Sequence, residues 1–231
     1  LRRLLPPSLR IEQIDTAVDP QRIHAVREAM LAQLARDLRD DWVWAFESHQ
    51  VHGGYTPDPV SAGRRALANR ALAMLCVDAL GAGDTVWPGR AYQRVKDAAN
   101  MTERLGALAA LTESHAELGE RALTHFHAQF SHEPLVIDKW FALQARMPER
   151  SDGRVFARVR QLMQHSDFTL KNPNRARSLI QAFCSFNPAG FHRADAAGYV
   201  FWADQVMQID AINPQLAARL ARAMDRWSHL A

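Results

Sequence analysis

Hydrophobic residues recur three and four positions apart along most of the chain, and alternating β-branched runs are almost absent. This spacing puts apolar side chains on one face of an α-helix, whereas a half-buried strand would repeat every two residues. The pattern therefore predicts helices and no sheet. The expected apolar stripes are Ile23, Val26, Met30 and Leu34; Leu67, Ala71, Leu75 and Leu80; Leu105, Leu108, Leu111 and His115; Leu123, Phe126 and Phe130; Val155, Val159, Leu162 and Met163; and Leu216, Leu220, Met224 and Trp227.

Five pairs of an Asp or Asn followed by proline mark the expected helix starts. The Asp or Asn side chain can accept a hydrogen bond from an unpaired N–H of the first turn, and proline at the next position loses no intrahelical bond. We expect a helix after each pair, although Gly190 follows the fourth pair so closely that a turn is the alternative there. The pairs are Asp19-Pro20, Asp58-Pro59, Asn172-Pro173, Asn187-Pro188 and Asn213-Pro214.

Helices joined by short polar turns, with no strands between them, predict an all-α fold. Helical pairs recur at roughly 35–45 residues, near the period of HEAT and armadillo units. We therefore expect a right-handed superhelical stack of helix pairs, a HEAT/armadillo-like α-solenoid, in preference to a compact bundle. Residues 1–231 are expected to form a single helical domain, whose concave side would be the usual binding surface.

Composition excludes few classes of protein beyond this. Apolar residues make up 48% of the chain, enough for a sizeable core, and the net charge of +3 is too small and too scattered to indicate nucleic-acid binding. No apolar run is long enough to span a bilayer, and no signal peptide is evident, so no membrane partner is expected. Cys76 and Cys184 lie in apolar helical contexts, which favours buried free thiols in a cytoplasmic protein over a disulfide.

The histidines do not form a recognisable metal motif. A helical zinc peptidase needs the pattern HExxH, with two imidazoles on one helix face and a glutamate as general base, and that pattern is absent. Solvated or partly packed histidine is the better interpretation, so we expect no metal in this chain. The groups considered are His49 with His52, His125 and His127 with His132 and Glu133, and His115 with Glu113 and Glu117.

Nucleophile motifs are also missing from the sequence. There is no G-x-S-x-G elbow, no glycine-rich phosphate loop and no C-x-x-C pair. Cys184 and His192 are separated by a helix and a turn, which argues against a catalytic pair. The sequence therefore predicts that this chain is not a self-contained enzyme.

Two arginine-bearing helices are the remaining candidates. In the helix expected after Asn172-Pro173, an apolar stripe of Leu179, Phe183 and Phe186 should anchor in the core, and Arg177 lies on a different side. In the helix expected after Asn213-Pro214, the face flanking the apolar stripe carries Gln215, Arg219, Arg222 and Arg226. Both faces are either solvated charge or an arginine-lined wall that recognises carboxylate or backbone carbonyl groups.

Several long strings in these segments resemble one family. They are NPNRARSLIQAF (172–183), NPAGFH (187–192), GYVFWADQV (198–206) and NPQLAARL (213–220), preceded in order by DPQRIHAVREAM (19–30), AANMTERLGAL (98–108) and VIDKWFALQA (136–145). Together they resemble the C-terminal helical domain of bacterial aminopeptidase N, the alanyl aminopeptidase family of zinc metalloaminopeptidases. The resemblance covers nearly the whole chain.

The resemblance implies a fragment of a peptidase. In the family, a thermolysin-like catalytic domain carries HExxH, a further glutamate ligand and a GAMEN motif, and the intact enzyme uses zinc to remove N-terminal residues from peptides. None of these motifs occurs here, and the chain opens on LRRLLPPS without an initiator methionine. The sequence is therefore expected to be truncated at its N-terminal side and, by comparison with the family, at its C-terminal side.

In the family, the helical domain closes over the active site and leaves a channel for peptides. Arg177, Gln215 and Arg219 match family positions that line this channel and contact the C-terminal side of a bound peptide. The expected function is thus a non-catalytic domain that covers the active site and supplies substrate contacts, with the catalytic domain of the same polypeptide and peptide substrates as its partners. The alternative is a free-standing α-solenoid that binds a partner protein through its concave face.

Overall fold

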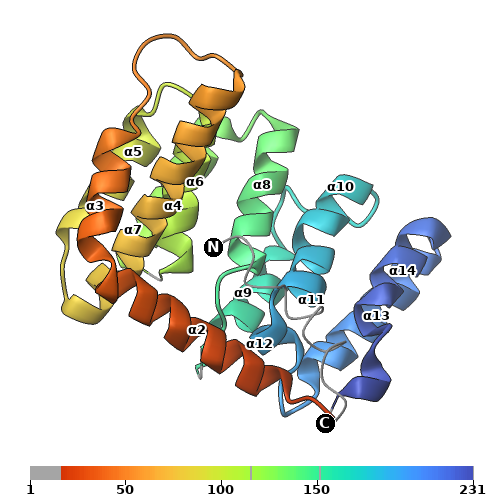
Figure 1. Ribbon diagram of the computed structural model, residues 1–231. Coiled ribbons are helices and arrows are strands. Elements are labelled where there is room, and N and C mark those ends of the chain that lie inside the picture. Colours follow the sequence, from red (N-terminus) through yellow and green to blue (C-terminus); the bar gives the residue numbers. More distant parts are fainter. Residues whose placement is uncertain (1–16, 115, 151, 231) are drawn as a thin grey trace. The chain divides into compact units, whose positions relative to one another are not determined.

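The computed structural model describes residues 17–114, 116–150 and 152–230, and these residues form helices and no strands (Figure 1). The only strand-like pairing among them is an isolated bridge between Val18 and Leu230. The all-α prediction is therefore confirmed. The helices are α2 (Pro20–Asp37), α3 (Arg39–Ser48), α4 (Pro59–Ala82), α5 (Val86–Asp97), α6 (Met101–Glu113), α7 (Leu118–Phe130), α8 (Pro134–Ala145), α9 (Arg154–Leu162), α10 (Pro173–Ala176), the π-helix η1 (Arg177–Gln181), α11 (Ala182–Phe186), α12 (Pro188–Phe191), α13 (Ala197–Asp210), α14 (Pro214–Ala221), and the 3₁₀ turns η2 (Arg222–Met224) and η3 (Trp227–His229).

The chain divides into two compact units. Unit 1 comprises Leu1–Arg27 and Phe141–Ala231, and unit 2 comprises Glu28–Trp140. Each unit has its own buried apolar core. None of the helices in the described ranges combines the length and apolar character that crossing a membrane requires.

Each of the five Asp-Pro and Asn-Pro pairs begins a helix, as predicted. In every case, proline is the first helical residue and the preceding side chain accepts a hydrogen bond from a first-turn N–H. At the fourth pair the result is the short helix α12, so the helical alternative is correct there. The accepted bonds are Gln21 N to Asp19 Oδ1 (2.9 Å), Ser61 N to Asp58 Oδ1 (2.9 Å), Asn174 N to Asn172 Oδ1 (3.0 Å), Gly190 N to Asn187 Oδ1 (3.1 Å) and Leu216 N to Asn213 Oδ1 (3.0 Å).

Asn187 has a second structural role. Its side-chain Nδ2 donates hydrogen bonds to the carbonyl oxygens of Ala145 (3.0 Å) and Met147 (2.8 Å), and the residue is buried. The amide therefore caps α12 and also satisfies two carbonyls at the end of α8, where helical carbonyls lack internal partners. One side chain joins two segments of unit 1 that are far apart in sequence.

Unit 2 is built around α4, which packs against α3, α5 and α6 (Figure 1). Ala71 and Leu75 of the predicted stripe are fully buried, but Leu67 and Leu80 are exposed. The prediction was wrong for these two residues because α4 is apolar on several sides. Three contacting helices bury a different and broader face, which includes Ala68, Leu72, Met74, Cys76 and Ala79.

The close packing of α4 on α6 depends on a small residue. Asn69 of α4 donates its Nδ2 hydrogen to the Thr102 carbonyl at 3.0 Å. A Cβ atom placed on Gly106 of α6 would lie 2.3 Å from the Asn69 side chain. The predicted α6 stripe holds for Leu108 and Leu111, which are buried, while His115 lies outside the described residues.

Unit 1 is centred on three phenylalanines from three helices. Phe183 of α11 stacks on Phe156 of α9 at a centroid distance of 5.5 Å, and Phe201 of α13 meets them edge-on at 5.8 and 5.7 Å. All three rings are buried. Such edge-to-face and offset pairs add to the stabilisation from buried area, so this trio fixes α9, α11 and α13 together.

The helix that carries Arg177 departs from the prediction at its end. Leu179 and Phe183 are buried as expected, whereas Phe186 is 56% exposed and lies beneath the Arg146 guanidinium at 4.4 Å. A π-turn holds more residues than an α-turn, so η1 rotates the residues that follow it backwards about the axis. Because Phe186 is also the last residue of α11, its ring leaves the core.

The expected long helix after Asn213 is also shorter than predicted. Leu216 and Leu220 are buried, but α14 ends at Ala221, and the chain continues in the 3₁₀ turns η2 and η3. Because a 3₁₀ turn has three residues rather than 3.6, the apolar stripe loses its phase there. Met224 is only partly buried, and Trp227 is 68% exposed.

The remaining predicted stripes are partly correct. Leu123 and Phe126 of α7 are buried, as are Val155, Val159 and Leu162 of α9. In α2, by contrast, Val26 and Met30 are exposed, and Ala35 is the buried residue of that helix. The spacing of the α2 residues therefore identified a helix correctly without identifying a core face.

The start of α13 imposes a steric requirement that we test with a substitution. A Cβ atom on Gly198 would lie 2.1 Å from the backbone carbonyl oxygen of Phe191, which cannot rotate away as a side chain could. We expect Gly198→Ala to lower the free energy of unfolding by about 1–3 kcal/mol, the usual cost of overpacking. Denaturant titration followed by circular dichroism measures this change.

The matched control is Gly63→Ala in α4. Nothing lies within 4 Å of a Cβ atom at Gly63, so alanine should stabilise that helix by up to about 1 kcal/mol through its higher helix propensity. Equal effects of the two substitutions, or a neutral Gly198→Ala, would contradict the steric account.

Candidate functional site

Arg177 is the first residue of the π-turn η1 and is partly buried. Its Nη2 donates a hydrogen bond to the Asn174 side-chain oxygen. The two residues are three positions apart on a helical stretch, which places their side chains on one face. Among the residues that the structure describes, Arg177 has no carboxylate partner, so its positive charge is not neutralised by an ion pair.

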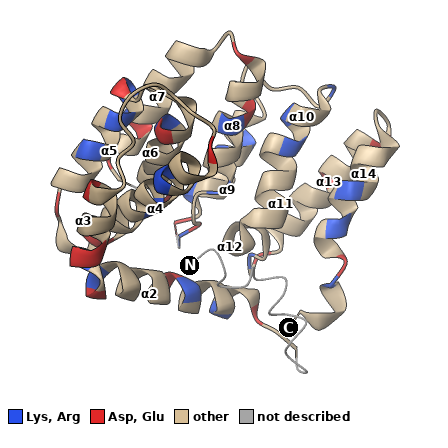
Figure 2. Cartoon of the chain, turned by 45° about the horizontal axis from the view of Figure 1, so that its top comes forward, with Lys and Arg blue, Asp and Glu red and all other residues tan. Residues whose placement is uncertain are grey.

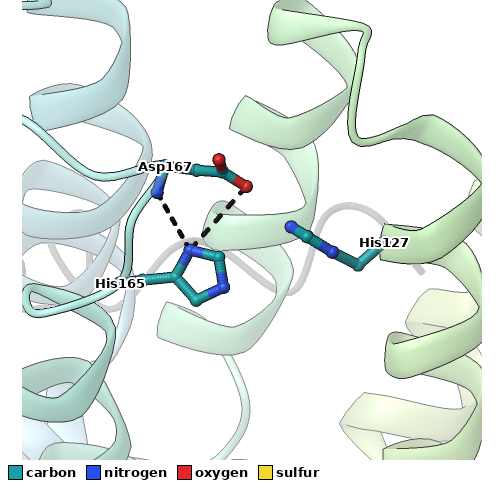
Figure 3. Close-up of side chains that lie close together, drawn as sticks. All are labelled: His127, His165 and Asp167. Carbon is teal, nitrogen blue, oxygen red and sulfur yellow. Dashed lines mark hydrogen bonds and ion pairs between the residues drawn. The ribbon is translucent and has the colours of Figure 1, made fainter.

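The neighbouring Arg175 has a different role. It is buried, donates through Nη1 to the Asp167 carbonyl oxygen, and lies over the Phe141 ring at 4.9 Å. The turn that supplies this carbonyl is held by His165, whose Nδ1 accepts from Asp167 N at 3.1 Å and lies 3.7 Å from the Asp167 carboxylate (Figure 3). Arg175 is therefore a core residue that fixes this turn.

Gln215 and Arg219 are exposed on α14 and lie four residues apart, which puts them on one helix face. Across the described ranges, Arg219 makes no hydrogen bond or ion pair. Arg222, in the turn that follows, pairs its Nε with the Asp225 carboxylate at 3.1 Å. The expected face of four polar residues therefore ends with α14, because Arg222 and Arg226 lie beyond that helix.

The two parts of the candidate site belong to the same compact unit. Phe183 and Phe201 join the helix of Arg177 to α13, and Trp202 of α13 donates its indole N–H to the Leu220 carbonyl of α14 at 3.0 Å. Figure 2 shows Lys and Arg positions on both α10 and α14. No hydrogen bond joins Arg177 to Gln215 or Arg219 within the described residues, so the site consists of separate polar groups on one framework.

The histidine groups considered from the sequence have other surroundings. His49 Nδ1 lies 2.9 Å from the Ala45 carbonyl oxygen, and His132 is exposed beside Glu133 at 3.8 Å. Within either compact unit, the described histidines, cysteines and carboxylates do not bring three potential metal ligands together.

The two cysteines are buried free thiols, as predicted. Burial raises the pKa of Cys76 to about 12, and it raises the pKa of the Cys184 thiol as well. A thiol with a raised pKa is a poor nucleophile at neutral pH. His192, the other member of the pair considered from the sequence, instead has its Nδ1 2.9 Å from the Tyr199 hydroxyl.

The partner of Arg177 was not identified from the sequence. The sequence does not distinguish Asn174 from other residues, because asparagine is common near helix starts. The available signal was its spacing of three residues from Arg177, which predicts contact on a helix surface. Spacing could not show that the asparagine side chain, rather than a carboxylate, holds this guanidinium.

Comparisons with known proteins identify the family of the chain. Residues 4–231 match a family described as a domain of unknown function (DUF3458_C) with ARM repeats. The chain is 38% identical over 224 residues to an aminopeptidase N of Caulobacter vibrioides, covering 96% of this chain and 25% of that protein. It is 32% identical over 222 residues to the aminopeptidase N of Escherichia coli, again covering 96% of this chain and 25% of the relative.

A solved structure is similar as well. The crystal structure of Legionella pneumophila aminopeptidase A in complex with aspartic acid matches 95% of this chain and 26% of its own, with a TM-score of 0.80 and 29% sequence identity. The chain thus spans about a quarter of the length of the relatives it matches and corresponds to their C-terminal part.

These findings show that the chain is an all-α protein of the ARM-repeat type, as the helical periodicity predicted. The chain belongs to the DUF3458_C family of ARM-repeat domains. The resemblance to the C-terminal region of aminopeptidase N is confirmed.

His192 gives a test of the packing between α12 and α13. Its imidazole lies among the Phe191 ring (4.9 Å), the Tyr199 ring (5.8 Å) and the Tyr199 hydroxyl, and burial lowers its pKa from 6.5 to about 4. The folded state therefore holds the neutral form. As the pH falls below 6.5, the unfolded chain binds a proton that the folded chain does not, so stability is lost on acidification.

We expect this residue to reduce the free energy of unfolding by up to about 1.4 kcal/mol per pH unit between pH 6.5 and 4. Urea titrations across this interval, on the unaltered chain and on His192→Gln, measure the contribution as a difference in slope. Glutamine retains a polar group beside Tyr199 but does not titrate. Identical pH slopes for the two proteins would show that His192 is not held neutral.

Proposed function

We propose that this chain is the non-catalytic C-terminal domain of an aminopeptidase, which covers the active site and supplies contacts to the far end of a peptide substrate. The observation that carries the proposal is the match of 96% of this chain to one quarter of a protein named aminopeptidase N. The catalytic domain of the same polypeptide is the expected partner. Buried free thiols at Cys76 and Cys184 support a cytoplasmic setting.

In this proposal, Arg177, Gln215 and Arg219 form part of the wall of a substrate channel. A guanidinium without a carboxylate partner offers hydrogen-bond donors to a peptide carboxylate or backbone carbonyl. The glutamine amide can donate to a carbonyl or accept from a peptide N–H. The residues would bind and orient the part of the peptide beyond the scissile bond, without touching the bond that breaks.

The zinc ion that the resemblance implies is assigned to the catalytic domain. This sequence lacks HExxH, the motif that supplies two zinc ligands and the general base in helical zinc peptidases. When bound in such a peptidase, zinc polarises the scissile carbonyl and activates a water molecule. The contribution of this chain is restricted to binding and to excluding competing water.

The first prediction from this proposed function concerns the chain by itself. Because the sequence lacks HExxH and therefore its zinc ligands and general-base glutamate, the purified chain should not hydrolyse an alanyl chromogenic amide, even with zinc added. The measurement is the absorbance of the released chromophore over time, with and without a chelator. Chelator-sensitive turnover by the pure chain would contradict a non-catalytic role.

The second prediction concerns the intact aminopeptidase. Arg177→Ala and Arg219→Ala should each lower kcat/KM for peptides of three or more residues by about tenfold, the effect of losing a hydrogen bond to a charged group. Hydrolysis of single-residue amides should fall less, because these substrates do not reach beyond the scissile bond. The ratio of the two specificity constants is the quantity to measure.

Arg222→Ala is the matched control for this experiment. Arg222 is also an exposed arginine beside α14, but the Asp225 carboxylate already pairs with it. Its removal should leave the ratio unchanged. Equal losses on long and short substrates for Arg177→Ala and Arg219→Ala would overturn the assigned role.

The alternative, a free-standing scaffold, has a separate test. An open reading frame that continues upstream through an HExxH motif supports the peptidase domain. A start codon immediately before Leu1 would support the scaffold.

A further inference from the structure

Asn174 is the residue that restrains Arg177. It lies three positions earlier on the helical stretch from Pro173 to Phe186, is exposed, and accepts a hydrogen bond from Arg177 Nη2 through its side-chain oxygen. It does not cap the helix, because Asn172 has that role and accepts from the N–H groups of Asn174 and Arg175. The side chain of Asn174 is therefore available to Arg177.

The partner of Arg177 differs in charge from the partners of three other arginines in unit 1. Arg154 pairs with Asp152 at 2.7 Å, Arg193 with Asp195 at 2.8 Å, and Arg222 with Asp225 at 3.1 Å. In each case a carboxylate both holds the guanidinium and neutralises it. The Asn174 amide holds Arg177 but does not neutralise its positive charge.

Asparagine is not the choice that helix stability alone would favour at this position. Residue 174 is the second residue after the cap, where a carboxylate interacts favourably with the helix dipole by a few tenths of a kcal/mol. An aspartate would also form an ion pair with Arg177. The neutral asparagine provides neither form of stabilisation, and it leaves the positive charge of Arg177 without a carboxylate to balance it.

We propose that Asn174 is a positioning residue, which orients Arg177 without neutralising it and so makes it selective for a negatively charged peptide end. This inference rests on the proposed function of Arg177. Within the described part of the chain, Nε and Nη1 of Arg177 make no hydrogen bond, so they remain available to a carboxylate. Restricting the side chain beforehand lowers the entropy lost when the peptide binds.

The test uses the intact aminopeptidase with a tetrapeptide, the same tetrapeptide amidated at its C-terminus, and an alanyl amide. Asn174→Ala frees Arg177 and should raise KM for the carboxylate-terminated tetrapeptide about two- to fivefold, the scale of ordering one long side chain. Asn174→Asp neutralises Arg177 and should raise it by about tenfold or more. Both effects should be smaller for the amidated peptide and smallest for the alanyl amide.

The melting temperature distinguishes a positioning role of Asn174 from a purely structural one. Asn174→Asp should keep or raise the melting temperature, because of the helix dipole and the new ion pair, while it weakens peptide binding. If Asn174 acted only on the fold, stability and binding would change in the same direction. Asp152→Ala, which removes the carboxylate partner of Arg154 in α9, is the matched control and should leave the KM ratio unchanged.

Failure of this inference is distinguishable from failure of the proposed function. If Arg177→Ala weakens the long peptide and Asn174→Asp does not, Arg177 binds the substrate without help from Asn174 and the positioning role is refuted. If Arg177→Ala has no selective effect, both proposals fail. In the double variant Asn174→Ala/Arg177→Ala, the effect of removing Asn174 should disappear, and additive effects would also refute the inference.

Discussion

The packing of Phe183 against Phe156 and Phe201 is the interaction on which the candidate site depends. Phe183 belongs to α11, which continues the helical stretch that carries Arg177, and Phe201 belongs to α13, the helix before α14. A hydrogen bond from the Trp202 indole N–H to the Leu220 carbonyl oxygen then fixes α14 against α13. Because protein interiors are close-packed, these contacts fix the positions of α11, α13 and α14 relative to one another. Side chains that are far apart in sequence thus share one framework.

Within that framework, the partner of each arginine decides its role. Arg175 is buried against an aromatic ring and a carbonyl oxygen, and it stabilises a turn. Arg222 is exposed but paired with a carboxylate. Arg177 is held by a neutral amide. These residues have the same intrinsic charge, yet only an arginine without a carboxylate partner offers that charge to a ligand.

Local rules explain why much of the fold could be predicted from the sequence. An Asp or Asn before proline specifies a helix start through atoms that are adjacent in the chain, and all five such starts were correct. Burial depends on neighbours from elsewhere in the sequence. Leu67 and Leu80 were therefore misassigned, as their apolar character says nothing about which sides of α4 are covered.

The errors at Phe186 and Trp227 have a different origin. Both follow a change of helical period, at η1 and η2 respectively, and a calculation with 3.6 residues per turn loses the correct angle there. The same limit applied to the candidate site. Arg177, Gln215 and Arg219 were identified by resemblance to a family, whereas the contact between Arg177 and Asn174 required coordinates.

We propose that this domain binds the far end of a peptide whose first bond is cut in the catalytic domain. The most direct test is a crystal structure of the intact aminopeptidase with a non-hydrolysable tetrapeptide. We expect the peptide's C-terminal carboxylate or last carbonyl to lie within hydrogen-bond distance of Arg177 or Arg219. A peptide that contacts only the catalytic domain, with both guanidinium groups directed away from it, would show that these arginines do not bind substrate.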